Sequence, residues 1–341
     1  MKIKKTIEII PGGMVVVPLF IAMIINTISP NLLRIGGFTQ ALFADGTMVL
    51  IALFLVCIGA QVKINKIGMS VKKGTTLLGL KWLVAVIVTL VAYIFAGPNG
   101  LFFGLAPIAI VAAMSNSSGG MYLAISGEFG SEEDLAAYPI LALNDGPFLS
   151  MVALSIFGFM GFVDGLFGFV DFVSVLLPIL IGAVLGNVDE EMRTFLSKGS
   201  DMIIPFFSFA IGMNINLSSI IEGGLGGIAL GVMTVVLTGG AAYLVYAKFG
   251  WNPIVGASEG STAGNAIATP AVLAAANPAF AAHMELATVQ IAACVVTTLV
   301  LLPIFITFLA KRLEKKGKLV RGGDPKDLLP RANVEAVREN A

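Results

Sequence analysis

The stretch SNSSGG, residues 115–120, interrupts an otherwise apolar segment, GLFFGLAPIAIVAAMSNSSGGMYLAISG, residues 100–127. In hydrocarbon every backbone N–H and C=O group needs a partner, so a spanning helix breaks only where it lines a cavity or packs on protein. Glycine weakens helix continuity, and serine and asparagine side chains compete for backbone hydrogen bonds. The stretch therefore predicts a membrane helix broken into two halves around a polar gap.

A second gap of the same kind lies late in the chain, in VGASEGSTAGNAIATPAVLA, residues 255–274. At each gap a half-helix begins, and its free N–H groups and partial positive charge favour an anion. Two such ends facing each other predict a cradle for a small anionic, polyhydroxylated ligand. The alternative is that these small residues only allow close helix packing. The candidate substrate-binding residues are Ser115, Asn116, Ser117, Ser118, Gly119, Gly120, Ser261, Thr262, Gly264 and Asn265.

The composition predicts an all-α membrane protein rather than a soluble one. Hydrophobic residues make up 57% of the 341-residue chain and charged residues 12%, against about 25% charged residues in a soluble domain. Basic residues form short clusters between apolar runs, which argues against nucleic-acid binding. Spans of about 20 apolar residues are expected at 11–29, 41–61, 76–96, 101–126, 137–161, 168–187, 199–215, 224–247, 253–276 and 285–310.

The positions of lysine and arginine predict that both termini are cytoplasmic. With the N-terminus inside, basic residues fall in inner segments, including the tail from Lys311 onward, and only Arg34 falls outside. Lys81, beside Trp82, is expected to reach the inner face by snorkelling.

The two halves of the chain predict an internal repeat. IGAQ (58–61) matches IGMN (211–214), SSGGM (117–121) matches STAGN (261–265), and Pro18 and Pro178 hold similar places. Each half has five expected spans, an odd number, so the second half enters the membrane from the opposite side. This is the inverted-repeat plan of secondary transporters, with the site between the repeats near mid-membrane, where spans four and nine are broken. The expected units are a first repeat at 1–165, a second at 166–312 and a charged cytoplasmic tail at 313–341.

Carboxylates inside expected spans are the candidate coupling groups, because such residues are costly in a membrane and mark ion or substrate pathways. Asp145 lies in NDGP, where Pro147 loosens the helix, and Glu259 lies at the second gap. Asp145, with Glu259 and Asn144, could load a proton or coordinate sodium, and the residues leave both open. The alternative is that Asp145 only caps or hydrogen-bonds a neighbouring helix and that Glu259 only caps a helix near the gap. No metal site or cofactor is expected, and the absence of H-E-x-x-H, G-x-S-x-G or a His/Cys cluster makes a membrane-embedded enzyme improbable.

Four stretches resemble the bacterial 2-keto-3-deoxygluconate permease family: IPGGMVVVPLFIAMIINT (10–27), SNSSGGMYLAISGEFG (115–130), YPILALNDGPFLSMVALS (138–155) and EGSTAGNAIATPAVLAAANP (259–278). The resemblance implies proton-coupled symport of 2-keto-3-deoxygluconate, a sugar-acid anion, into the cell. It also implies kinship with the fold of bile-acid transporters and sodium/proton antiporters, in which two broken helices cross, here spans four and nine. It implies a location in the bacterial cytoplasmic (inner) membrane, with spans three to five and eight to ten moving against the others. Sodium-coupled uptake of another small organic anion is the alternative, and oligomers are compatible with either.

Overall fold

The computed structural model describes residues 2–8, 13–62, 68–97, 100–162, 167–217 and 219–319, with the side chains of 201 and 219–222 left out. Most of the expected tail at 313–341 therefore lies outside the described residues. Within the described part of the chain every regular element is a helix, and the one β-bridge pairs Phe102 with Leu105. The predicted all-α class is confirmed.

One group of helices, here called the panel, packs around glycines. An added Cβ on Gly59 would lie 2.1 Å from the Ile179 carbonyl oxygen, and one on Gly182 would lie 2.0 Å from that of Val56. Small residues at such contacts let helix backbones approach closely. The panel helices, which contact one another, are α2 (Gly13–Ile28), α4 (Thr47–Gln61), α11 (Phe169–Val188) and α12 (Glu190–Gly212). Two short helices pack against the panel: α1 (Ile3–Glu8) contacts α2, and α3 (Gly37–Phe43) contacts α12.

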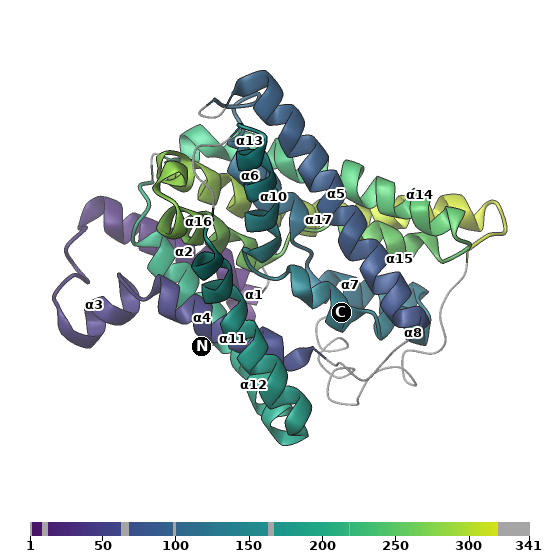
Figure 1. The fold of residues 1–341 in the computed structure, drawn as a ribbon, viewed down its shortest axis with the longest axis horizontal. Coiled ribbons are helices and arrows are strands. Elements are labelled where there is room, and N and C mark those ends of the chain that lie inside the picture. Colours follow the sequence, from purple (N-terminus) through teal and green to yellow (C-terminus); the bar gives the residue numbers. More distant parts are fainter. Residues whose placement is uncertain are drawn as a thin grey trace.

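The remaining helices form a second group, here called the core group. Figure 1 shows α5, α14, α15 and α17 to the right of the panel, with α6, α10 and α13 above it. The members are α5 (Met69–Ala96), α6 (Pro107–Ser115), α7 (Gly119–Phe129), α8 (Glu132–Leu135), α9 (Tyr138–Leu141), α10 (Phe148–Phe159), α13 (Ser219–Met233), α14 (Gly240–Lys248), α15 (Pro253–Ala257), α16 (Thr269–Ala276) and α17 (Met284–Glu314). A π-helical turn, Thr234–Gly239, joins α13 to α14.

Five helical segments of the described chain are long and apolar enough to cross a membrane, and seven if each of two bent pairs is one span. The bent pairs are α3 with α4, at 61°, and Glu132–Asn144 with α10, at 54°. Each of the ten expected spans overlaps a helix or a broken helix, but α2 is short, α12 begins with charged residues, and 253–276 is interrupted. The count of ten spans stays a prediction.

Both predicted interruptions are present. In the first, α6 ends at Ser115 and α7 begins at Gly119, with Asn116 in extended conformation (φ −102°, ψ 128°). In the second, α15 passes through a 3-10 turn, Ser258–Gly260, into extended Ser261 (φ −97°, ψ 159°) before helix resumes. The residues between the half-helices are mostly buried in protein, which is where a spanning helix can break.

Candidate functional site

The two interruptions lie against each other and satisfy one another's backbone groups. Ala263 N–H donates to the Asn116 carbonyl at 3.3 Å. Ser118 N–H donates to Ser261 Oγ at 3.0 Å, and Thr262 Oγ1 donates to the Ala113 carbonyl at 3.1 Å. The polar residues of each gap thus replace the helical hydrogen bonds that the other gap has lost.

Asn144 and Asp145 connect both interruptions from a third element, the bend between α9 and α10. Asn144 Nδ2 donates to Ser117 Oγ at 2.8 Å, and its Oδ1 accepts from Ser117 N–H at 3.3 Å. Asp145 Oδ1 accepts from Asn265 Nδ2 at 2.8 Å. The next residue, Gly146, has φ +95°, a conformation that glycine adopts without steric cost. Adjacent residues of one bend therefore bind the first gap and the second gap.

Glu259 extends this network into the second interruption. Its side chain is fully buried, and Oε2 accepts a hydrogen bond of 2.5 Å from Ser117 Oγ. Ser117 thereby links Asn144 to Glu259, the two residues that accompany Asp145 among the predicted coupling groups. The other carboxylate oxygen, Oε1, has no hydrogen-bond partner among the described residues. The structure brings all three predicted coupling residues into one polar cluster.

Lys81 corrects one expectation and adds a residue to the site. Sequence reasoning placed its ammonium at the inner face, but the residue is 1% exposed. Nζ donates to the carbonyls of Glu259 and Ser261, at 2.6 Å each. The distance of Lys81 from the start of its helix could have indicated that the side chain is buried. α5 begins at Met69, and a rise of 1.5 Å per residue puts Lys81 about 18 Å from that end.

The predicted substrate-binding residues divide by exposure. Ser115 is buried against the Ser150 hydroxyl, with 3.1 Å between their oxygens. Asn116, Ser117, Ser261 and Thr262 are also buried, and all four belong to the hydrogen bonds that join the gaps. The more accessible members lie at the starts of the outgoing half-helices: Gly120 is exposed, and Ser118, Gly119 and Gly264 are half-buried. Asn265 is buried, with 8% of its surface exposed.

A small cavity opens beside the bend, between panel and core group. Its volume is about 250 Å³, slightly below the roughly 300–1,000 Å³ of sites for drug-sized ligands. An added Cβ on Gly146 would lie 2.9 Å from Leu55 Cδ2, so the cavity wall touches the bend that holds Asp145. The lining residues are Met48, Ile51, Ala52, Leu55, Pro147, Asp171, Ser174, Val175, Pro178, Val272, Ala275 and Ala276.

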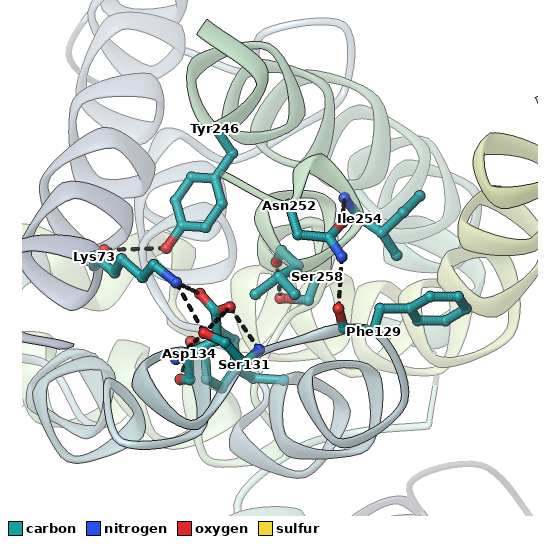
Figure 2. A network of polar contacts seen from close by, with 10 residues as sticks. Lys73, Phe129, Ser131, Asp134, Tyr246, Asn252, Ile254 and Ser258 are labelled. Atoms are coloured by element: carbon teal, nitrogen blue, oxygen red, sulfur yellow. Dashed lines mark hydrogen bonds and ion pairs between the residues drawn. The ribbon is translucent and has the colours of Figure 1, made fainter. Parts of the chain in front are cut away.

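A separate buried ion pair ties one end of the core group together. Lys73 Nζ lies 2.8 Å from Asp134 Oδ1 and donates to Ser131 Oγ at 3.1 Å, as Figure 2 shows. Tyr246 from α14 donates to the Lys73 carbonyl at 3.3 Å, and Asn252 Nδ2 donates to the Phe129 carbonyl. The acidic segment GEFGSEEDLAAY (residues 127–138) thus supplies the partner of Lys73.

Comparison with known proteins identifies the family. A family model described as 2-keto-3-deoxygluconate permease matches residues 4–315. The chain belongs to this family. The permease is 45% identical over 319 residues to 2-keto-3-deoxygluconate permease 1 of Salmonella typhimurium, covering 94% of this chain and 99% of the relative.

Two further relatives are both named 2-keto-3-deoxygluconate permease. One, from an Enterobacter species, is 39% identical over 318 residues, with 92% of this permease and 94% of the relative covered. The other, from Bacillus subtilis, is 37% identical over 323 residues, with 93% and 96% covered. The resemblance expected from the sequence is confirmed, and the family is one of transporters rather than enzymes.

Proposed function

We propose that the permease is a secondary transporter that takes up 2-keto-3-deoxygluconate in symport with protons across the bacterial inner membrane. The family match and the names of the relatives support the substrate. The bound species is a monocarboxylate that bears hydroxyl groups. Such a ligand suits a site built from helix N-termini, amides and hydroxyls.

The observation that supports coupling is the bridge made by Asn144 and Asp145. A carboxylate that loads a proton can control transport only if it contacts the elements that bind substrate. Asp145 contacts Asn265 of the second gap, and its neighbour Asn144 contacts Ser117 of the first. Protonation at Asp145 therefore changes hydrogen bonding at the second gap and, through one peptide unit, at the first. Glu259 is the second proton-coupling candidate through its bond from Ser117.

Substrate is proposed to bind at the start of α7, which is exposed at Gly120, and at the half-buried start of the turn that begins at Gly264. Gly120 has no heavy atom within 4 Å of an added Cβ, which leaves open space beside the free N–H groups of α7. Ser118 and Asn265 offer a hydroxyl and an amide at the same two ends. The buried gap residues Ser115, Asn116, Ser117, Ser261 and Thr262 would hold these ends in position.

Equivalent contacts in the two halves support the proposed inverted repeat of ten spans, with both termini cytoplasmic. Gly59 of IGAQ packs on the carbonyl of Ile179, the residue after Pro178. Gly212 of the matching IGMN packs on the carbonyl of Leu19, the residue after Pro18, where an added Cβ would lie 2.3 Å away. The same motif in each half thus contacts the same feature of another panel helix.

Alternating access is proposed as movement of the core group against the panel. The panel contacts the core group near the proposed site: α4 contacts the 3-10 turn Ala142–Asn144, and α12 contacts the turn Gly264–Ala268. The cavity of about 250 Å³ lies in the same seam. A sliding movement along this seam would change which side of the membrane reaches the gaps.

The test is uptake of labelled 2-keto-3-deoxygluconate into proteoliposomes that contain the purified permease. An imposed proton gradient, acid outside, should drive accumulation in sodium-free buffer. The same uptake with a sodium gradient at equal pH on both sides should only equilibrate the substrate. Equilibration under both gradients would contradict the proposal of active transport.

Sodium-coupled uptake of a small organic anion is the second candidate, and one observation favours it. Each interruption holds a buried side-chain oxygen, Asn116 Oδ1 in the first and Glu259 Oε1 in the second, that has no hydrogen-bond partner among the described residues. Free buried oxygens of this kind can ligate sodium in broken-helix transporters. Accumulation driven by the sodium gradient alone, in the assay above, would favour this candidate.

A further inference from the structure

The Lys81 ammonium lies at the end of a half-helix that stops inside the protein. Nζ donates to the carbonyls of Glu259 and Ser261, at 2.6 Å each. These carbonyls are available because the 3-10 turn ends at Gly260 and Ser261 is extended. The last carbonyls of a helix have no helical partners and concentrate partial negative charge. The position therefore attracts a cation.

The Glu259 side chain adds negative charge at the same place. It is fully buried, Oε2 accepts from Ser117, and Oε1 has no partner among the described residues. The carboxylate belongs to the same residue whose carbonyl binds the Lys81 ammonium. Unwound backbone carbonyls at the end of a half-helix are the groups that coordinate sodium in broken-helix transporters.

The first interruption is satisfied in a different way. The carbonyl of Ala112 accepts from Asn116 Nδ2 at 2.9 Å, and that of Ala113 accepts from Thr262 Oγ1. Neutral donors are thus sufficient for the end of α6. At the second interruption a neutral donor, Thr238 Oγ1, also reaches the Glu259 carbonyl, at 3.0 Å, yet a full cation lies there as well. The need to hydrogen-bond these carbonyls therefore does not by itself explain why a charged ammonium lies at this position.

We propose that Lys81 is a built-in cation: its ammonium occupies a monovalent-cation site formed by the carbonyls of Glu259 and Ser261, and the buried Glu259 side chain supplies the negative charge that favours a cation there. Removal of the ammonium leaves an oxygen-lined site that sodium fills. The consequence for transport rests on the proposed function: with the lysine ammonium in this site, the second gap does not require a bound sodium ion. Lys81 is a positioning residue, because it holds the end of the broken helix and touches no proposed substrate group.

The experiment measures thermal unfolding of the purified full-length permease in detergent, in sodium chloride and in choline chloride of equal concentration, without substrate. Lys81→Met removes the ammonium and keeps an apolar stem of similar length. Its melting temperature should be higher in sodium than in choline by about 5 °C more than that of wild type, as expected for a site filled at about 100 times its dissociation constant. Lys72→Met is the matched control, since Lys72 lies on the same helix with its ammonium 5.8 Å from the centre of the Trp251 ring. It should respond to the two salts as wild type does.

A second substitution tests the ligand set. Adding Glu259→Gln to Lys81→Met should remove the extra sodium shift. If Lys81→Met is not recovered folded, Lys81→Gln takes its place, and recovery in sodium but not in choline is then the expected result. Equal salt shifts in the lysine variant and wild type would overturn the proposal. So would failure of both variants to be recovered in either salt. Because no gradient or substrate is present, these outcomes are independent of whether protons drive uptake.

Discussion

Replacement of Asp145 by asparagine separates a coupling role from a structural one. Asparagine keeps an Oδ1 acceptor for the 2.8 Å hydrogen bond from Asn265 Nδ2. The free energy of unfolding should therefore change by less than about 1 kcal/mol, the net contribution of one hydrogen bond. The variant has no group at this position that gains or loses a proton. It should bind substrate and exchange it across the membrane, yet fail to concentrate it.

The size of the effect follows from charge balance. A monocarboxylate that enters with one proton moves no net charge, so a gradient of one pH unit supports at most about 10-fold accumulation, the equivalent of 1.36 kcal/mol. If Glu259 loads a second proton, the chemical limit becomes about 100-fold. For Asp145→Asn the ratio of inside to outside substrate should fall to about 1 if Asp145 alone couples.

The assay follows labelled substrate in proteoliposomes with acid outside, and counterflow exchange shows that the variant still translocates. Asp45→Asn is the control, because that side chain is 54% exposed, between α3 and α4, and lies outside the network. It should accumulate substrate as wild type does. Accumulation by Asp145→Asn to the same ratio as wild type would refute the reasoning and leave Asp145 as a helix-to-helix contact.

Three further predictions concern the permease's packing and its binding end. Gly182→Ala should lower the melting temperature and the yield of folded protein, because its Cβ would lie 2.0 Å from the Val56 carbonyl oxygen and overpacking costs about 1–3 kcal/mol. Gly79→Ala is the control and should leave both unchanged, because an added Cβ there has no heavy atom within 4 Å. Lys73→Met should destabilise by about 3–5 kcal/mol by leaving Asp134 buried without its cation, and Lys73→Met with Asp134→Leu should recover much of the loss in thermal unfolding. Gly120→Val should fold, given the open space at that position, but raise KM for uptake by obstructing the start of α7; an unchanged KM would place the substrate elsewhere.

The sequence predicted the two broken helices correctly but did not predict which residues contact them. Glycine, serine and asparagine act on their own backbone, so SNSSGG and SEGSTAG are legible as interruptions without any knowledge of the fold. Asp145 was likewise identifiable, because a carboxylate between apolar runs is costly in a membrane. The prediction for Lys81 was wrong, since snorkelling assumes that a lysine meets water or lipid rather than a helix end.

The sequence by itself determined that the chain is an all-helical membrane protein, that two of its helices are interrupted, and that it resembles the permease family. These properties depend on hydropathy, local backbone preference and motif. Only the tertiary structure decided that the two gaps satisfy each other's backbone, that Asn144 and Asp145 join them, and that Lys81 ends at Glu259 and Ser261. The physical reason is that a buried polar group must find a partner, and the partner can lie more than a hundred residues away, where no local pattern records it.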